Sequence, residues 1–515
     1  MSSCMIREST VDGRRVDHYE PVRGGVSSVV TKPSKDERNR PAADRGVAGA
    51  ACGTLCRARK PQIRDGASFG MQRSLPAPPD AGLLNAVRFG SDTFRFLEGV
   101  QARFEDGTAI PVPGRPPLVV LTNPELIEAA LDRRDEFTRV DAQGSAAMIA
   151  EQGLVQSEGD LWEQQRSAMA PAFAGRQVAA YANTTGRRAH RLAESWAETG
   201  TQELNLHRAM TAMTIRVASE ILLGEDIGRE RADQFHEWMA VAGREFEFDI
   251  EVAMPEWVPT PTSGEFETAA EGIRGLSEEL IERRRATLAD GGDAGSDMLT
   301  LLLRAQENPE VEMPDEQIRD EVATFLIAGH ETTALSLTYT LSLLSWNPEA
   351  RRRVREEAHE ALGDGPPEHD DLADLEYTKR AYREALRLYP PAWAVFRQAD
   401  GDQPLGDYLI EDGSAIITPQ WSVHRDDRYF EAPETFDPDR WARRDPNAVS
   451  AYFPFSTGPH ACIGRGFALS GATLVLARLV RDFDVDVPED ALDDLRITPT
   501  LRPADGVDAT VRPAE

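Results

Sequence analysis

Residues 315–345 carry the longest helical pattern in this chain of 515 residues. At about 1.5 Å per residue such a helix extends over roughly 45 Å, enough to cross a whole domain through its middle. Apolar residues dominate the run, which indicates burial along most of its length. The rest of the domain must therefore surround this helix, and that constrains the fold more than any other feature.

Further helical patterns precede and follow the long run, at 124–131, 160–172, 177–198, 206–223, 229–241, 269–289, 298–307, 348–362, 375–389 and 464–483. Strand patterns are shorter, at 118–121, 394–398, and as a pair at 408–410 and 414–418 that turns at residues 411–413. Residues 424–450 are rich in Pro, Asp and Arg and predict little regular structure. We expect one large, mainly α domain with minor β structure over residues 75–515.

Residues 1–74 differ from this domain in composition. They are polar, rich in Gly, Ser and Arg, and without periodicity, so we expect them to be disordered or to precede a true start at Met71. They contain no apolar segment typical of a secretory signal. No run of about 18–20 apolar residues occurs, which predicts a protein without a membrane span, located in the cytoplasm.

The net charge of −30 is unevenly distributed. Residues 1–70 hold 13 Lys and Arg against 8 Asp and Glu, and the remainder holds 44 against 79, with Lys379 as its only lysine. An acidic surface low in lysine is typical of salt-adapted proteins, although an ordinary acidic protein from a GC-rich genome has a similar composition. Either origin argues against nucleic acid as a partner.

Three of the four cysteines lie in the first 60 residues, which is not the pattern of a disulfide framework. The fourth, Cys462, lies in the sequence FSTGPHACIG at 455–464. Gly458 and Gly464 permit tight turns and the close approach of a flat ligand. A cysteine at the start of a helix is favoured as a thiolate and can bind iron. The alternative is an inert, buried cysteine.

A second motif, AGHETT at 328–333, interrupts the apolar pattern of the long helix. Gly329 costs about 0.5–1 kcal/mol relative to alanine in a helix, which suggests a groove for a ligand. Thr332 could donate a hydrogen bond there, and Glu331 could relay protons from water. A simple kink is the alternative. Zinc is disfavoured, because His330 has no second histidine at the required spacing.

Other polar residues gain meaning only in combination. Glu384 and Arg387 share a helix face, and a buried Glu384 held also by Arg440 would connect that helix to the segment before the cysteine loop. A second set is most simply read as surface residues, but around a dianionic porphyrin its members become propionate anchors: Trp162, Arg166, Arg397 and His460.

Over residues 75–505 the chain resembles the cytochrome P-450 family, the haem-thiolate monooxygenases. The resemblance rests on four motifs in family order: Trp162-x-x-x-Arg166, AGxETT at 328–333, Glu384-x-x-Arg387 with Arg440, and FxxGxHxCxG at 455–464. It implies that Cys462 is the proximal ligand of haem b (iron protoporphyrin IX). Thr332 and Glu331 would deliver protons to dioxygen. Ala328, Gly329 and Phe455 would contact the cofactor. His460 stands where arginine is commoner.

The resemblance further implies a monomer that inserts one oxygen atom of O2 into a C–H bond of a hydrophobic small molecule. Fatty acids, terpenoids and steroid-like molecules are candidates, and the pocket would be lined near Phe325, Ala328 and residues 394–396. No flavin or ferredoxin motif occurs, so electrons would come from a separate ferredoxin or flavoprotein that docks near Arg443, Arg444 and Arg465.

Two other readings remain open at this point. One is a peroxide-driven hydroxylase, or an isomerase or lyase, on the same haem-thiolate fold. Such relatives generally alter the acid–threonine pair, which this chain keeps as Glu331 and Thr332. The other is a non-catalytic haem sensor or electron carrier. A covalent carrier would show a Cys-x-x-Cys-His motif, which is absent.

Overall fold

The computed structural model describes residues 73–78, 82–112, 114–140, 147–245, 264–291, 297–308 and 313–514, with two short strands near the N-terminus. The chain divides into two compact units, Met1–Ala67 and Ser68–Glu515. In the first unit β1 (Thr10–Val11) and β2 (Arg14–Arg15) pair antiparallel. The expected boundary at residue 74 stays a prediction, because most of residues 1–74, with Met71 and three cysteines, lie outside the described part.

The second unit is mainly helical, as the periodicity predicts. Two 3₁₀ turns, η1 (Ala170–Phe173) and η3 (His369–Asp374), lie between helices, and a third, η4 (Pro446–Ala448), precedes the cysteine loop. The predicted helices are all present to within a few residues, but α1, α2 and the short helices α4, α14 and α15 have no counterpart in the sequence prediction. The helices are α1 (Gly82–Ser91), α2 (Thr93–Arg103), α3 (Pro124–Asp132), α4 (Ala147–Ala150), α5 (Gly159–Met169), α6 (Gly175–Thr199), α7 (Leu206–Leu222), α8 (Gly228–Glu245), α9 (Gly264–Ala289), α10 (Met298–Gln306), α11 (Asp315–Trp346), α12 (Pro348–Ala361), α13 (Glu376–Leu388), α14 (Gln420–Val423), α15 (Arg440–Arg443) and α16 (Arg465–Asp482).

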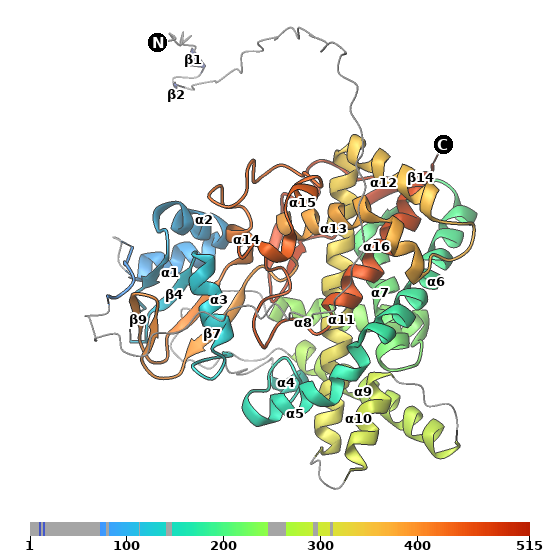
Figure 1. Ribbon diagram of the computed structural model, residues 1–515, viewed down its shortest axis with the longest axis horizontal. Coiled ribbons are helices and arrows are strands. Elements are labelled where there is room, and N and C mark those ends of the chain that lie inside the picture. The colour runs from blue at the N-terminus through green and yellow to red at the C-terminus, as the bar shows by residue number, and fades with distance from the viewer. Residues whose placement is uncertain are drawn as a thin grey trace, which may run out of the picture. The chain divides into compact units, whose positions relative to one another are not determined.

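The central helix α11 has 32 residues and so extends over about 48 Å. Asn347 ends it, and Pro348, which cannot continue a helix, begins α12. Most of its side chains are buried against α7, α9 and α13. Figure 1 shows α11 running through the helical part of the unit, with α7 and α16 beside it and the larger sheet on the opposite side from these helices.

The largest sheet has the strand order β3-β4-β10-β7-β5. Its centre is the parallel pair of β4 and β10, and β7 lies antiparallel to β10. Apolar side chains of β4 and β10 are buried on both sides, which suits central strands. The strands are β3 (Gly107–Ile110), β4 (Leu118–Leu121), β5 (Phe137–Thr138), β7 (Val395–Ala399) and β10 (Ala415–Thr418).

The predicted pairing of residues 408–410 with 414–418 is wrong. The turn exists, with Gly413 at a φ of 73° and the Ser414 N–H donating to the Glu411 carbonyl. However, β9 (Tyr408–Ile410) pairs with β8 (Gln403–Leu405), whereas β10 enters the large sheet. The physical reason is burial: the Ile-Ile-Thr end of β10 is fully buried, so it takes a central position rather than the edge of a hairpin.

Two smaller sheets complete the unit. In one, β14 (Asp508–Pro513) lies between β11 (Phe483–Asp486) and β6 (Gln202–Asn205), so the C-terminal segment pairs with a strand three hundred residues earlier. The other is the hairpin of β12 (Leu495–Ile497) and β13 (Leu501–Pro503).

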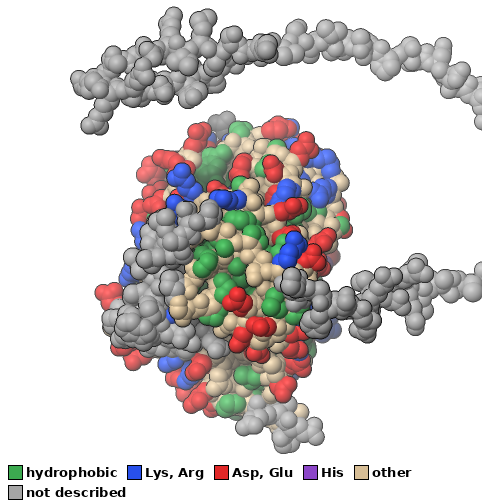
Figure 2. All heavy atoms as spheres, turned by 90° about the vertical axis from the view of Figure 1, so that its left-hand side faces the viewer, with side chains coloured by type: hydrophobic (Ala, Val, Ile, Leu, Met, Phe, Trp, Pro, Cys, Tyr) green, Lys and Arg blue, Asp and Glu red, His purple; other side chains and the backbone are tan. Residues whose placement is uncertain are grey.

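The surface of the second unit carries both signs of charge. Figure 2 shows acidic side chains spread over the face that bears the large sheet, with arginines among them. Within the part of the chain that the structure describes, none of the helices is long and apolar enough to cross a membrane.

Candidate active site

Cys462 lies three residues before the start of α16, and its N–H donates to the Phe455 carbonyl at 2.9 Å. The Cys462 thiol is exposed, although Phe455 packs against the central core. Burial raises the pKa of this thiol, while the N–H groups of Gly464 and Arg465 and the guanidinium of Arg166 lower it. A thiol that is both desolvated and exposed faces an internal space rather than bulk water.

The glycines of the cysteine loop have different roles. Gly458 has a φ of 73°, and a Cβ there would clash with the Leu131 carbonyl of α3, so the protein itself requires glycine. Gly464 has a φ of −84°, and its Cβ would meet only the Cys462 sulfur at 3.9 Å. Protein contacts therefore do not explain Gly464, whereas a flat ligand against the loop would. The loop also holds Ser456 at a φ of 59°, which is uncommon outside glycine.

On α11 the turn that begins at Ala328 opens onto space. Ala328 is exposed in the middle of this helix, whereas His330, two residues further on, is only 1% exposed. The helix continues through the turn, and the Thr332 hydroxyl donates to the Ala328 carbonyl at 3.0 Å. A Cβ at Gly329 would meet only side chains of α7 at ordinary contact distances of 3.5 Å. An exposed alanine in a buried helix again indicates an internal space.

The Glu331 side chain contacts an arginine rather than the open space beside Ala328. It is 8% exposed and forms an ion pair with Arg502 of β13. The Arg502 guanidinium lies against α8, where a Cβ at Gly243 would clash with it. The His330 ring packs edge-to-face on Phe235 of α8 at 5.1 Å, and among the described residues no group of three His, Cys, Asp or Glu side chains could hold a metal ion. The pair of Glu331 and Arg502 thus joins α8, α11 and β13.

Arg139 and His460 approach Glu158, just before α5, and Arg166 and Arg397 lie near His460. The Arg139 N–H donates to Glu158 at 2.6 Å, and the His460 Nε2 lies 3.5 Å from the other carboxylate oxygen. Burial lowers the pKa of Arg139 to about 10 and also lowers the pKa values of Arg166 and Arg397. Both ring nitrogens of His460 and the Nε of Arg397 are buried without a hydrogen-bond partner. Desolvated cationic and polar donors of this kind are suited to an anionic ligand.

Residues of α5 connect these groups to the cysteine loop. The Trp162 ring lies 4.4 Å from the His460 ring in an edge-to-face arrangement, and the Arg134 guanidinium lies over the same indole at 4.9 Å. Arg166, one turn later, donates to the Ala461 carbonyl at 3.1 Å. The structure therefore places the four predicted anchors, from α5, β7 and the cysteine loop, in one neighbourhood.

Sequence reasoning missed three members of this site: Arg139, Glu158 and Arg502. Arg139 follows the two-residue strand β5, and Arg502 lies in a hairpin near the C-terminus. Neither arginine belongs to a motif, and each becomes significant only through contacts across nineteen residues or more, with Glu158 and with Glu331. No signal in the sequence could have identified them.

The buried carboxylate of Glu384 on α13 is held by two arginines. Arg387 donates to it at 2.8 and 3.1 Å, and Arg440 donates at 3.2 Å. All three side chains are at most 5% exposed. Arg387 also donates to the carbonyls of His424 and Pro433. The contacts expected between α13 and the segment before the cysteine loop are therefore present.

The residues expected near the substrate lie in apolar surroundings. Phe325 stacks on Phe173 at 5.7 Å, and Phe396 packs edge-to-face on Trp393 at 5.4 Å. Ala394 is 9% exposed, and Val395 packs partly buried against the apolar cluster that includes β4 and α3. That these residues line the substrate pocket stays a prediction.

The three arginines expected to receive an electron donor all have partners. Arg443 pairs with Asp437, and Arg444 donates to the Tyr429 carbonyl at 2.6 Å. Arg465 donates to Asn447 and lines a hollow of about 340 Å³ beside residues 455–457. Arg383 and the carboxylate of Glu128 line the same hollow, so its positive charge comes from Arg465 and Arg383 rather than from Arg443.

These features together match a haem. The exposed thiol of Cys462 is suited to bind iron, and the exposed Ala328 marks open space on α11. The buried nitrogens of His460 and Arg397 that have no hydrogen-bond partner are suited to bind propionates. Gly464 has no side chain, so the cysteine loop leaves room for a flat ring there.

Comparison with known proteins supports the same assignment. The profile of the cytochrome P450 family matches residues 93–507. The chain is 32% identical to cyclooctat-9-en-7-ol 5-monooxygenase of Streptomyces melanosporofaciens, over 69% of this chain and 78% of the relative. It is 30% identical to a cytokinin hydroxylase of Arabidopsis thaliana (78% and 80%) and 28% identical to 11-oxo-beta-amyrin 30-oxidase of Glycyrrhiza uralensis (82% and 80%). The chain therefore belongs to the cytochrome P450 family and is a haem-dependent oxidoreductase that incorporates oxygen from O2.

Proposed function

We propose that this protein uses haem b to hydroxylate a C–H bond of a hydrophobic small molecule, with electrons from a separate redox protein. The observation that carries the proposal is the exposed, desolvated thiol of Cys462 close to buried nitrogens of His460 and Arg397 that have no hydrogen-bond partner. When bound, the haem supplies oxygen activation, which no amino-acid side chain can provide. The protein's own residues bind it, exclude water and move protons.

Cys462 would be the proximal ligand. Metal binding requires the thiolate, and the N–H groups of Gly464 and Arg465 with the guanidinium of Arg166 favour that form against the effect of burial. The same donors would tune the electron density on the sulfur. His460, Arg166 and Arg397 would bind the propionates, with Arg139 as a fourth donor that orients Glu158. Trp162 would hold the His460 ring in place.

Thr332 and Glu331 would deliver protons for oxygen activation. The Thr332 hydroxyl donates to its own helix at 3.0 Å and can turn toward the space beside Ala328. Glu331 adjoins it in sequence, and Arg502 holds the carboxylate in position. Glu331 can serve as a proton relay when water reaches this pair. Arg502 is in this account a positioning residue.

The substrate would be hydrophobic, because the neighbouring side chains on α11 and β7 are apolar. The names of the relatives are consistent with this: they specify cyclooctat-9-en-7-ol, a cytokinin and 11-oxo-beta-amyrin. The electron donor would be an acidic ferredoxin or flavoprotein that reaches the hollow lined by Arg383 and Arg465.

The ligation is tested by the absorption spectrum of the reduced, haem-loaded protein under carbon monoxide. We expect a strongly red-shifted Soret band, which indicates thiolate ligation, and its loss in Cys462→Ser. A globin-like band in the unmodified protein, or an unchanged shift in Cys462→Ser, would contradict the assignment. Ser456→Ala in the same loop is the matched control and should retain the shift.

Proton delivery is tested by Thr332→Ala in the presence of substrate, O2 and reductant. Loss of the hydroxyl should lower the product formed per O2 consumed, with hydrogen peroxide released instead. Thr333→Ala is the neighbouring control, because its hydroxyl donates to Gly329 rather than to Ala328. If turnover needs only hydrogen peroxide and is the same in Thr332→Ala, the protein is a peroxide-driven hydroxylase and Thr332 has no role in oxygen activation.

A further inference from the structure

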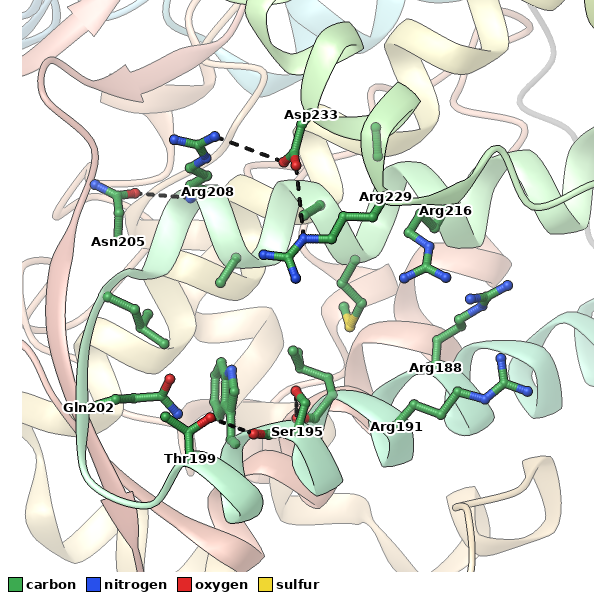
Figure 3. A pocket seen from close by; sticks show the side chains of 17 residues that line it. Arg188, Arg191, Ser195, Thr199, Gln202, Asn205, Arg208, Arg216, Arg229 and Asp233 are labelled. Atoms are coloured by element: carbon green, nitrogen blue, oxygen red, sulfur yellow. Dashed lines mark hydrogen bonds and ion pairs between the residues drawn. The ribbon is translucent and has the colours of Figure 1, made fainter.

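A cavity of about 550 Å³ lies between α6, α7 and the first turn of α8, well within the size range of small-molecule sites. Its lining includes none of the residues of the cysteine loop, of the 328–333 motif or of the propionate anchors. Figure 3 shows arginine side chains from all three helices around this space. The cavity is therefore a separate feature of the molecule.

Its charge is opposite to that of the chain. Five arginines line the cavity against the single carboxylate of Asp233, in a protein with a net charge of −30. The arginines are Arg188, Arg191, Arg208, Arg216 and Arg229. Like charges that gather on an acidic protein repel one another unless an anion lies between them.

The two inner arginines have carboxylate partners. Asp226 accepts from Arg216 at 2.8 and 3.0 Å and lies 2.8 Å from Arg188, which also pairs with Glu220. Burial alone would raise the pKa of Asp226, yet these arginines and the Gly228 N–H lower it below its usual value. This network fixes the wall of the cavity and leaves Arg188 and Arg216 little freedom to move.

The three outer arginines are different. Asp233 is 3.9 Å from both Arg208 and Arg229, too far for a hydrogen bond to either. Arg191 has no ion-pair or hydrogen-bond partner among the residues described. The side chains of Arg208 and Arg229 are 60% and 89% exposed, so they can adjust to a ligand. Arg208 and Arg229 therefore share one distant carboxylate at the rim, and Arg191 has none among the described residues.

The floor of the cavity is apolar. Trp196 and Met213 are buried, and Leu192 and Ala209 pack partly buried against the same core. An inorganic anion would satisfy the rim and leave this floor uncovered, whereas a neutral molecule would leave the guanidinium groups unpaired. A ligand that matches both parts has one anionic group and an apolar body.

We propose that this cavity binds an anionic amphiphile, a small molecule with a phosphate, carboxylate or sulfonate on an aromatic or aliphatic body. The rim arginines Arg191, Arg208 and Arg229 bind the anion, and the floor at Trp196 receives the apolar part. The site is independent of the haem and of the proposed hydroxylation.

The test is calorimetric titration of the haem-loaded, full-length protein with 2-naphthyl phosphate in a phosphate-free buffer. Binding should be at least about tenfold tighter than that of 2-naphthol or of inorganic phosphate, and should weaken as NaCl is raised. The ferric Soret band should not change, because the ligand does not enter the haem pocket. Equal binding of 2-naphthol, or a Soret change that parallels the titration, overturns the proposal.

Charge-reversed variants locate the site. The double variant Arg191→Glu, Arg229→Glu should bind 2-naphthyl phosphate about tenfold or more weakly. The control is Arg187→Glu, an exposed arginine of α6 one turn before Arg191 and outside the cavity, which should bind as the unmodified protein does. All three substituted arginines are exposed. Circular dichroism checks that the variants remain folded. Equal affinity in the double variant and the control overturns the proposal.

Discussion

Glu321, two turns before Ala328 on α11, shows how burial sets the behaviour of a single residue. One of its carboxylate oxygens accepts from the Leu154 N–H at 3.1 Å, and the other is buried without a hydrogen-bond partner. Burial and, to a lesser extent, Asp320 raise the pKa of Glu321 to about 8, against the lowering effects of the Leu154 N–H and of Arg139. The folded protein therefore holds a proton here that the unfolded chain releases at lower pH.

Because of this difference, the free energy of unfolding falls as the pH rises. The folded-state pKa lies above the ordinary value of 4.5, so the stabilisation is complete below about pH 4.5 and is lost as pH rises through 8. At about 1.4 kcal/mol per pKa unit, the free energy of unfolding should fall by a few kcal/mol across this window. Urea unfolding of Glu321→Gln between pH 5 and 8.5 should show a smaller decline.

Glu316→Gln, at an exposed position on the same helix, is the control and should reproduce the pH dependence of the unmodified protein. If Glu321→Gln declines as steeply as this control, Glu321 does not titrate in the predicted range.

At the scale of the elements, α13 is attached to the segment before the cysteine loop by one charge network. Glu384 accepts from Arg387, Arg440 and the Asp437 N–H, and the two arginines also donate to backbone carbonyls between residues 424 and 435. This segment has little regular structure, so side chains supply the hydrogen bonds that a helix or sheet would otherwise provide. The network thus holds the route by which the chain approaches Cys462.

Removal of its single carboxylate should be costly. Glu384→Gln keeps the shape but leaves two buried guanidinium groups without a negative partner, which should lower the free energy of unfolding by about 3–5 kcal/mol. Glu376→Gln, which breaks an exposed pair with Lys379 on the same helix, should lower it by no more than about 1 kcal/mol. Urea unfolding and haem retention measure both. Equal losses in the two variants would mean that the network is not what anchors this segment.

At the scale of the whole molecule, the dominant quantity is the net charge of −30. Many arginines already form close pairs with carboxylates, such as Arg216 with Asp226 and Arg355 with Asp484. These pairs act over a few ångströms and are screened less than the repulsion between distant surface carboxylates. Added salt should therefore relieve more repulsion than it weakens attraction.

We predict that the midpoint of thermal unfolding rises by several degrees between about 0.02 and 0.5 M KCl, because the Debye length falls below the spacing of the surface charges. NaCl at the same ionic strength should act equally, since the effect is one of screening. Differential scanning calorimetry measures it. A midpoint that is constant or falls with salt would argue that this is an ordinary acidic protein without salt adaptation.

The sequence by itself determined the helices, the cysteine loop and the 328–333 motif, because periodicity, glycine and a few chemically distinctive residues act locally. The longer helices from α3 onward were predictable for this reason, and so was the contact of Glu384 with Arg387, which lies on the same helix. Only the tertiary structure decided which strand β10 pairs with, that Arg502 holds Glu331, and that Arg139 and His460 meet at Glu158. Only it brought the arginines of α6, α7 and α8 around one cavity. Such contacts depend on how buried surfaces far apart in the chain pack together, and no local pattern of residues encodes that.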